Sequence, residues 1–389
     1  MEKVKLVRVT TVPQSLYKLL EGQLKYMSQY FSVTAISTEG ELLDKVALRE
    51  NITTTAIKMN RGISPIRDIV SIIKMISFLT KNKPNIIHSH TPKAGLVSMI
   101  SGYISGVPIR MHTVAGMPLE SRSGLKRKLL LYAEKLTYKF ATKVFANSYG
   151  IEKFILENRL TSNSKLSIIK KGSSNGIDSN YFSRSPKLES KATQIRRQLG
   201  IKVDTFVFGF IGRLVKDKGI NELISCFAEL SKVRNVHLIL VGKYENELDP
   251  LSEKTNRLIS DLPNISFVGY QSDVRPYFMS FDAFVFPSYR EGLPNVLLQA
   301  AAMEVAILAS DCTGNTDIVE HKVTGILFSI ADEESLGHAM ISIIAEEERE
   351  SYVIKARRSI ELNYTREGVW EDLYVEYQNL LESKDSNKS

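Results

Sequence analysis

A short segment in the second half of the chain brings together an acid, a glycine and a proline between two apolar runs. Glu291, Gly292 and Pro294 follow residues 282–286, which are typical of a buried strand, and precede an alanine-rich helical pattern over 296–302. A helix start exposes unpaired N–H groups and partial positive charge, and so favours phosphate. We therefore expect an enzyme site for a sugar nucleotide, with Glu291 accepting hydrogen bonds from sugar hydroxyls. The alternative is that Glu291 only caps the helix.

A second segment places two cations at a predicted strand-to-helix turn. Arg213 and Lys218 follow Gly212, where an apolar strand ends. Two fixed cations at this spacing can neutralise a diphosphate, and a departing nucleoside diphosphate requires such compensation. The spacing of Gly209 and Gly212 does not match a dinucleotide fingerprint. The alternative is a solvated basic turn.

Polar residues in other segments are further candidates. His112 ends a predicted strand, from which it could reach a bound sugar; the alternative is a satisfied core histidine. Residues 314–325 form another candidate loop, and whether it touches the ligand is left open. His88 and His90 alternate on a strand and share one face, but no third ligand follows nearby, so we expect no metal site.

Length and charge predict two domains. The chain has 389 residues, and its net charge of +8 is divided unevenly. Residues 1–176 contain 27 Lys and Arg against 11 Asp and Glu, whereas residues 177–389 contain 24 against 32. A basic and an acidic half suggest different partners. Cys226 and Cys312 lie in apolar runs, so we expect two buried, reduced thiols and a cytosolic protein without a signal peptide or transmembrane helix.

Both halves alternate predicted strands and helices. In the first half, helices are expected over 15–30 and 66–81, the latter because Ile66, Ile69 and Ile73 recur at helical spacing. The Gly- and Ser-rich residues 170–178 are interpreted as a linker, and a second series of strands begins at 206. The pattern predicts an α/β chain of two doubly wound domains that bind ligands at the carboxyl ends of their strands, in the cleft between the two lobes.

The order of these motifs resembles a known family. Gly212-Arg-Leu with Lys218-Gly219, then residues 284–295 with the sequence FVFPSYREGLPN, and then Gly314 with Thr324-Gly-Ile-Leu327 resemble the GT-B-fold retaining glycosyltransferases of family GT4. The resemblance spans nearly the whole chain. Segments 88–95 and 112–116 are similar to the branch that builds bacterial capsule, O-antigen and exopolysaccharide.

The resemblance implies roles for individual residues. Arg213 and Lys218 would hold the donor diphosphate, Glu291 would bind the donor sugar, and His112 would contact that sugar from the first domain. The other donor-side residues are Gly212, Gly269, Tyr270, Gly292, Leu293, Pro294, Asn295 and Gln299. The expected acceptor-side residues are Gln14, His90 and Lys93. No metal is implied, because the Arg/Lys pair and the helix dipole would take its place.

The resemblance also implies the domain bounds and shows two departures. An N-terminal acceptor domain would comprise 1–176 with a returning helix at about 366–389, and a donor domain would comprise 177–365. The family has two glutamates separated by seven residues, but the second position here is Gln299. An amide still accepts and also donates hydrogen bonds, so ribose binding would survive at a cost. In the first loop, residues 10–15 lack the paired glycines of many relatives.

Residues 124–140 form an amphipathic, basic pattern. Leu125, Leu129 and Tyr132 belong to its apolar stripe. The cations of this segment proposed to meet an anionic membrane are Lys126, Arg127, Lys128, Lys135 and Lys139. The alternative is a solvated face above core residues; nucleic-acid binding is disfavoured because no reading motif is present.

The resemblance and the basic half together lead to one expected function. It is a retaining transferase that moves a hexose or N-acetylhexosamine from a nucleotide sugar, expected to be UDP-linked. The acceptor would be a polyprenyl-diphosphate-linked saccharide at the inner face of the cytoplasmic membrane. The alternatives are a nucleotide-sugar epimerase or phosphorylase on the same fold, and a degenerate sugar-nucleotide-binding partner protein.

Overall fold

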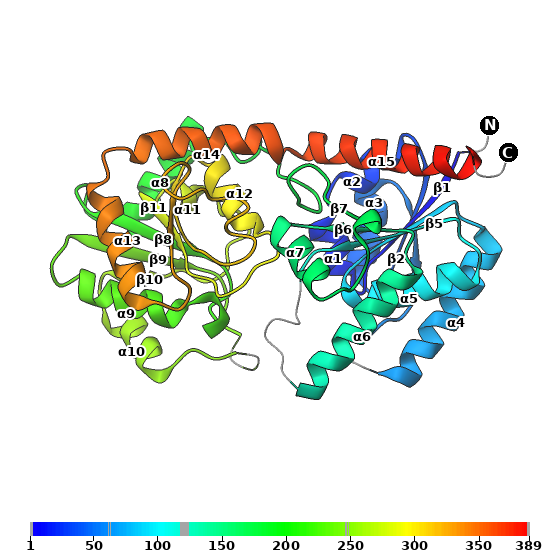
Figure 1. Ribbon diagram of the computed structural model, residues 1–389. Coiled ribbons are helices and arrows are strands. Elements are labelled where there is room, and N and C mark those ends of the chain that lie inside the picture. Colours follow the sequence, from blue (N-terminus) through cyan, green and yellow to red (C-terminus); the bar gives the residue numbers. More distant parts are fainter. Residues whose placement is uncertain are drawn as a thin grey trace. The chain divides into compact units, whose positions relative to one another are not determined.

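The computed structural model describes residues 3–60, 62, 64–116, 124–245, 247 and 249–386, except the side chains of Lys126 and Asp385. The chain divides into two compact units (Figure 1). Unit 1 comprises Met1–Gly176 with Arg366–Ser389, and unit 2 comprises Ile177–Thr365. Among the described residues, no helix combines the length and the apolar character needed to cross a membrane.

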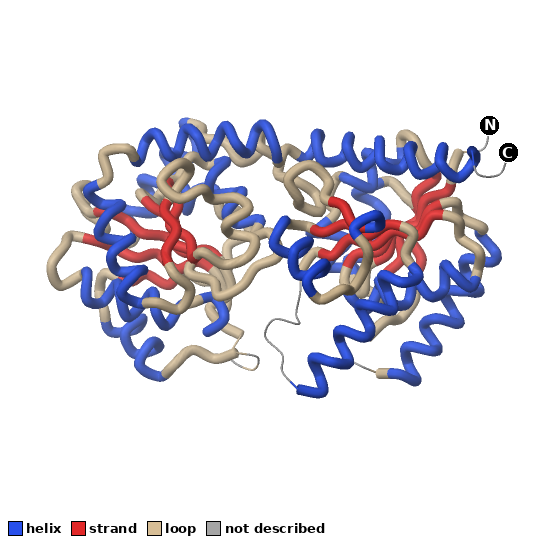
Figure 2. The backbone as a smooth tube through the Cα atoms, in the orientation of Figure 1, coloured by secondary structure: helices blue, strands red, loops and turns tan. Residues whose placement is uncertain are grey.

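Unit 1 is built on a parallel sheet in the order β3-β2-β1-β4-β5-β6-β7. Its strands are β1 (Lys5–Val9), β2 (Ser32–Ser37), β3 (Thr53–Ala56), β4 (Ile86–His90), β5 (Ile109–Val114), β6 (Lys143–Ala146) and β7 (Leu166–Ser167). The central strands β1 and β4 are buried because helices cover both faces of the sheet, as expected of doubly wound sheets, although they include polar residues (Figure 2). The strand order reverses between β1 and β4, which makes their carboxyl ends the ligand-binding edge of such a sheet.

The helices of unit 1 differ from the prediction at one place. They are α1 (Pro13–Leu19), α2 (Gln23–Ser28), α3 (Glu41–Glu50), α4 (Pro65–Asn82), α5 (Pro92–Ile104), α6 (Gly124–Phe140), α7 (Tyr149–Glu157) and α15 (Arg366–Ser386), with a 3-10 turn at Asn163–Lys165. The single helix predicted over 15–30 is wrong. It is divided at Gly22, whose φ is 78°, and a Cβ there would lie 2.8 Å from the Trp370 ring.

The segment interpreted as a linker is packed into unit 1. Ser173, Ser174 and Asn175 are buried. The Asn175 side-chain oxygen accepts from Trp370 Nε1 at 2.7 Å and from Gln23 Nε2 at 3.1 Å. The boundary between the two units does fall within this segment, at Gly176 and Ile177, but these three residues are packed into unit 1 and do not form a free linker.

Unit 2 repeats the same architecture with the order β10-β9-β8-β11-β12-β13. Its strands are β8 (Phe206–Ile211), β9 (Val236–Val241), β10 (Ile265–Phe267), β11 (Ala283–Phe286), β12 (Ala306–Ser310) and β13 (Ile326–Phe328). Its helices are α8 (Pro186–Gln198), α9 (Ile220–Leu230), α10 (Glu253–Asp261), α11 (Arg275–Phe278), α12 (Asn295–Ala302), α13 (Glu333–Ala345) and α14 (Arg349–Asn363), with a 3-10 turn at Lys216–Lys218. The predicted α/β class with two doubly wound sheets is confirmed. Both cysteines are free, and Cys226 is only partly buried, contrary to the expectation.

Candidate functional site

The candidate site lies where the strand order of unit 2 reverses. β8 and β11 are neighbours, and the chain leaves each strand at its carboxyl end through a loop that carries predicted site residues. The loop after β8 contains Arg213 and Lys218, and the loop after β11 contains Glu291. Parallel strands bring both loops to one edge of the sheet, which explains how residues far apart in sequence meet.

Lys218 and Glu291 form an ion pair at this edge. Their side chains are only 15% and 14% exposed, so water screens the pair weakly. The Lys218 ammonium also lies 5.4 Å from the centre of the Phe286 ring. The cation predicted for the diphosphate and the acid predicted for the sugar are thus in direct contact, and a diphosphate must share or displace Glu291 to reach Lys218.

Arg213 has a more open environment. Its side chain is 52% exposed, and its Nη1 donates to Glu245 Oε2 at 2.7 Å. An exposed ion pair of this kind contributes little stability, so it can be exchanged for a ligand at small cost. Gly212 precedes it, and a Cβ there would lie 2.8 Å from the Phe210 ring.

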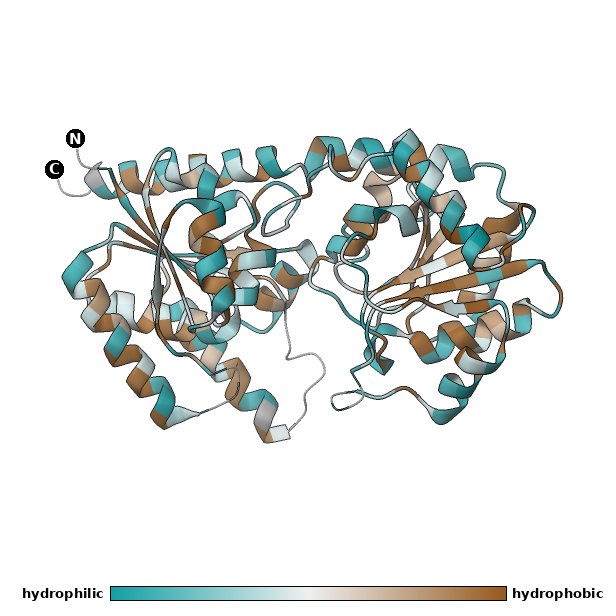
Figure 3. Ribbon diagram, turned by 180° about the vertical axis from the view of Figure 1, so that it is seen from behind, coloured by the Kyte–Doolittle hydropathy of each residue, from teal (hydrophilic) through white to brown (hydrophobic). Residues whose placement is uncertain are grey.

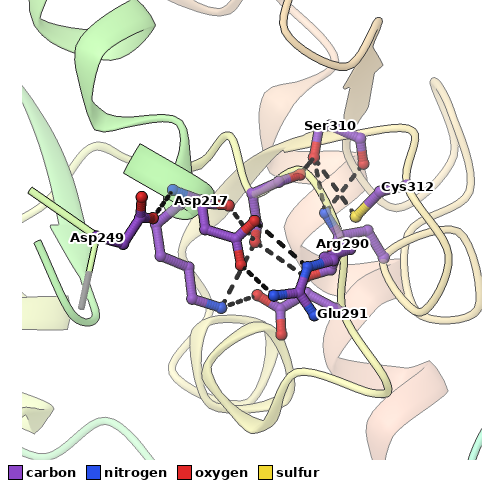
Figure 4. A network of polar contacts seen from close by, with 9 residues as sticks. Asp217, Asp249, Arg290, Glu291, Ser310 and Cys312 are labelled. Atoms are coloured by element: carbon purple, nitrogen blue, oxygen red, sulfur yellow. Dashed lines mark hydrogen bonds and ion pairs between the residues drawn. The ribbon is translucent and has the colours of Figure 1, made fainter. Parts of the chain in front are cut away.

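The two site loops are tied together by residues that the sequence analysis did not identify (Figure 4). Arg290 donates to both carboxylate oxygens of Asp217, from Nη2 at 2.7 Å and from Nε at 3.3 Å. The Asp217 N–H donates to Asp249 at 2.7 Å, and its carbonyl accepts from the Tyr289 N–H at 3.0 Å. We call the Arg290–Asp217 pair the loop clamp. It fixes the residues next to Glu291 and Lys218.

A third loop supports the one that carries Glu291. The Ser310 hydroxyl donates to the Ser288 carbonyl, and Asn315 Nδ2 donates to the Ser310 carbonyl at 3.0 Å. Gly314 has a φ of 84°, and a Cβ there would lie 2.5 Å from the Gly292 carbonyl oxygen. The candidate loop 314–325 therefore reaches the site, and only glycine fits its closest approach.

The start of α12 differs slightly from the prediction. Pro294 precedes the helix with a φ of −78° and a ψ of 111°, and α12 begins at Asn295, one residue before the predicted helical pattern over 296–302. Leu293 is buried, whereas Asn295 is exposed and Gln299 is partly buried. Glu304, with a φ of 56°, lies beyond the end of α12 and does not replace the missing glutamate.

Gly269 and Tyr270, two of the expected donor-side residues, border open space. Gly269 has a φ of 70°, and nothing lies within 4 Å of a Cβ built there. Tyr270 is 54% exposed, and the Lys243 ammonium lies 4.9 Å from the centre of its ring. An exposed aromatic ring beside a cation can stack on a nucleobase.

In unit 1, His112 lies on β5 and is buried. Its Nδ1 is 2.9 Å from the Ser89 hydroxyl, and a Cβ on Gly95 would lie 2.5 Å from its ring. Burial lowers the pKa of His112 to about 4, so the ring is neutral at pH 7. It supplies no charge, and because it is only 1% exposed, contact with a ligand would require its surroundings to open.

The three predicted acceptor-side residues have different environments. Gln14 is exposed at the start of α1, whereas Lys93 is paired with Asp68 at 2.5 Å. His90 is buried, with its Nε2 2.7 Å from Arg8 Nη2. Contact with a ligand would therefore require Lys93 to leave its partner, and the burial of His90 favours a structural role.

The buried Arg8 was not recognised in the sequence, where it interrupts an apolar strand. Its guanidinium donates to Gln23 Oε1 at 2.6 Å and to Tyr377 Oη at 3.0 Å. No carboxylate contacts it among the described residues. Burial lowers the pKa of Arg8. The pKa values of His88 and His90 lie well below their usual range, mainly because both rings are buried and secondly because the charge of Arg8 is close.

The proposed membrane residues lie on α6, as predicted. Lys128, Lys135 and Lys139 are exposed and Arg127 is half-buried, while the Lys126 side chain lies outside the described residues. The alternative of a basic face above a core-facing stripe is wrong for the first half of the helix. Leu125, at 82% exposure, faces solvent along with Leu129 and Tyr132.

The described residues contain no group of three or more His, Cys, Asp or Glu side chains placed to hold a metal ion.

Comparisons with known proteins cover nearly the whole chain. Residues 191–359 match the family model "Glycosyl transferases group 1", and residues 18–148 match "Glycosyl transferase 4-like". The capsular polysaccharide biosynthesis glycosyltransferase CapM of Staphylococcus aureus is 32% identical over 99% of this chain and 100% of its own length. The UDP-Gal:alpha-D-GlcNAc-diphosphoundecaprenol alpha-1,3-galactosyltransferase of Escherichia coli is 26% identical over 73% of this chain and 72% of its own. HepE of Anabaena, solved in complex with UDP, matches in fold with a TM-score of 0.80 at 19% identity, over 97% of this chain and all of that one.

Proposed function

The chain belongs to the GT4 family of GT-B-fold glycosyltransferases, and from this premise we propose the reaction that it catalyses. It transfers a hexose or N-acetylhexosamine from a UDP-linked donor to a lipid-linked saccharide, with retention, during surface polysaccharide biosynthesis. The observation that carries the proposal is the contact between Lys218 and Glu291 at the reversal point of the unit 2 sheet. The similarity to CapM and to an enzyme named for a diphosphoundecaprenol acceptor supports the polysaccharide pathway and the lipid carrier.

The donor side of the reaction follows from the site geometry. Lys218 and Arg213 neutralise the diphosphate as the bond to the sugar breaks, and the N–H groups at the start of α12 add partial positive charge. Glu291 accepts hydrogen bonds from sugar hydroxyls once the diphosphate competes for Lys218. The leaving phosphate helps to deprotonate the acceptor hydroxyl on the same face of the sugar, which retains the anomeric configuration. Such charge compensation requires no metal.

The remaining residues position the substrates. Gln299 binds the ribose, Tyr270 stacks on the base, and neutral His112 donates or accepts a hydrogen bond at the sugar. The acceptor is presented by unit 1, whose basic residues on α6 favour an anionic membrane surface. The protein then works at the inner face of the cytoplasmic membrane, where its lipid-linked substrate is anchored.

A product assay tests the proposal. The purified chain is incubated with a panel of UDP- and GDP-sugars and a synthetic polyprenyl-diphosphate-linked N-acetylglucosamine, and products are identified by mass spectrometry and NMR. We expect an α-linked disaccharide that forms only when both substrates are present. Conversion of the donor sugar without an acceptor would indicate the epimerase alternative. Binding of UDP without any product would indicate the degenerate partner.

Replacing Gln299 by glutamate is expected to strengthen UDP binding by roughly fivefold. A charged acceptor makes a stronger hydrogen bond to the ribose hydroxyls than a neutral amide, by about 1 kcal/mol. Titration calorimetry with UDP compares Gln299→Glu with the wild type, and UMP serves as a second ligand with the same ribose. Unchanged affinity for both ligands would show that residue 299 does not reach the ribose.

Breaking the loop clamp is expected to lower kcat/KM by about 10- to 100-fold. Asp217→Asn or Arg290→Gln releases the loop that carries Glu291 from the loop that carries Lys218, and small displacements of positioned groups are costly in catalysis. The double exchange Asp217→Arg with Arg290→Asp restores the pair and should recover much of the activity. If the single variants are as active as the wild type, the clamp has no role in positioning.

A further inference from the structure

The outward face of α4 is apolar, although none of the described residues of unit 1 covers it. Ile66, Ile69, Val70 and Ile73 recur at helical spacing and are 80%, 57%, 48% and 60% exposed. The opposite face of α4 is the one that packs inward: Met75 and Leu79 are buried, and α4 contacts α5. A run of exposed isoleucines on a single helix face marks an interaction surface rather than a core contact.

A second helix on the same support has the same character. α6 also packs against α5 (Figure 1). Hydrophobic and hydrophilic positions alternate along its ribbon (Figure 3), and its Leu125, Leu129 and Tyr132 are 82%, 46% and 65% exposed. Their spacing places them on one stripe of the helix. Two neighbours of α5 therefore each present an apolar stripe to solvent.

Both stripes are bordered by positive charge. On α4 the exposed cations beside the stripe are Arg67 and Lys74, and on α6 they are Lys128, Lys135 and Lys139. Each helix contains one acid in its sequence, Asp68 on α4 and Glu134 on α6. Asp68 is paired with Lys93, and Glu134 is buried. The two helices thus combine exposed apolar and basic residues without an exposed carboxylate.

We propose that the face formed by Ile66, Ile69, Val70 and Ile73 inserts into the interfacial layer of an anionic bilayer, with the stripe of α6 as a second point of entry. This combination of an apolar stripe and basic flanks is that of helices which lie in a membrane interface. The proposal rests on the proposed function, because a lipid-linked acceptor brings the enzyme to such a surface, and it adds an apolar anchor to the electrostatic contact of α6.

Charge favours a bilayer over a second copy of this chain. In a symmetric dimer the same surface is present on both sides of the interface, so the cations around α4 and α6 would face identical cations. No exposed carboxylate on these helices would compensate them. An anionic lipid surface offers both the apolar layer and the opposite charge.

The first experiment measures vesicle binding without any sugar donor. Ile66→Ser/Ile69→Ser/Ile73→Ser is compared with wild type in flotation assays on phosphatidylglycerol-containing and pure phosphatidylcholine vesicles. We expect at least tenfold weaker binding to the anionic vesicles. The matched control is Ile354→Ser/Leu362→Ser, which removes two similarly exposed apolar residues from α14 and should bind normally. Because all these residues are exposed, the variants should keep the wild-type melting temperature.

The second experiment separates insertion from surface adhesion. Tryptophan placed by Ile69→Trp should be quenched by brominated lipids, whereas the emission of Ile354→Trp, which like Ile69→Trp includes the native Trp370, should not be quenched. If the serine variant binds vesicles as the wild type does while Lys128→Gln/Lys135→Gln/Lys139→Gln does not, the contact is purely electrostatic and the insertion is wrong. A dimer in sedimentation that the serine variant alone dissociates, with unchanged vesicle binding, would also overturn it.

Activity distinguishes this inference from the proposed function. We expect the serine variant to lose transfer to an acceptor embedded in vesicles but to keep transfer to a short-chain acceptor in solution. If the wild type shows neither activity, the result counts against the proposed function, but the measured binding to vesicles still stands. Full activity of the serine variant on the embedded acceptor would count against the inserted face.

Discussion

Transfer is expected to be lost in a Glu291→Ala variant that keeps its fold. Glu291 lies in the loop between β11 and α12, and it is held beside Lys218 before any ligand competes for that lysine. Without the carboxylate, the donor sugar loses the group that fixes its hydroxyls, and loss of one positioned polar contact in a preorganised site costs about 10²- to 10³-fold in kcat. Steady-state kinetics with the donor identified in the product assay give the measurement.

The same variant should retain UDP, which distinguishes loss of the site from loss of the fold. Removing Glu291 frees the Lys218 ammonium for the diphosphate, so UDP should bind at least as tightly as in the wild type. Lys218→Gln should instead weaken UDP binding and turnover together. Glu253→Ala, which removes a 91% exposed acid, is the control. Turnover by Glu291→Ala within tenfold of the wild type would contradict the assignment of this acid.

The contact between Lys218 and Glu291 could be anticipated from the sequence because both residues lie close to strand ends. Lys218 and Glu291 each follow an apolar run that is recognisable alone, and parallel packing of such runs brings their ends together. The loop clamp was missed for the opposite reason. Asp217 and Arg290 are separated by more than 70 residues, and no pattern in either segment indicates that their side chains form a pair.

Periodicity also predicted helices without showing which face is covered. Residues 66–73 are apolar at helical spacing, which ordinarily indicates contact with the core, yet here the buried side of α4 is the one with Met75 and Leu79. The break at Gly22 is another case. The ring of Trp370, a residue near the other end of the chain, leaves no room for a side chain at position 22. Only the tertiary structure contains these relations.

Unit 1 is expected to lose stability steeply between pH 6.5 and about pH 4.5. Burial, aided by Arg8 in the first two cases, lowers the folded-state pKa values of His88, His90 and His112, the last to about 4. Above pH 6.5 these rings are neutral in both states, so their contribution is complete. Below pH 6.5 the unfolded chain binds protons that the folded unit does not bind. The free energy of unfolding therefore falls by about 1.4 kcal/mol per pH unit for each histidine.

One group opposes this trend and reduces its slope. Burial raises the pKa of Glu134 to about 7, so the folded unit takes up that proton first and gains stability as the pH falls. The net difference is about two protons, or roughly 3 kcal/mol per pH unit, which is a large part of the stability of a typical domain. Urea unfolding followed by the fluorescence of Trp370, the single tryptophan and a residue of unit 1, measures it. His90→Gln removes one of the titrating rings and should flatten the dependence by about one proton. A midpoint that stays constant from pH 6.5 to 5 would mean that these histidines remain free to take up protons in the folded unit.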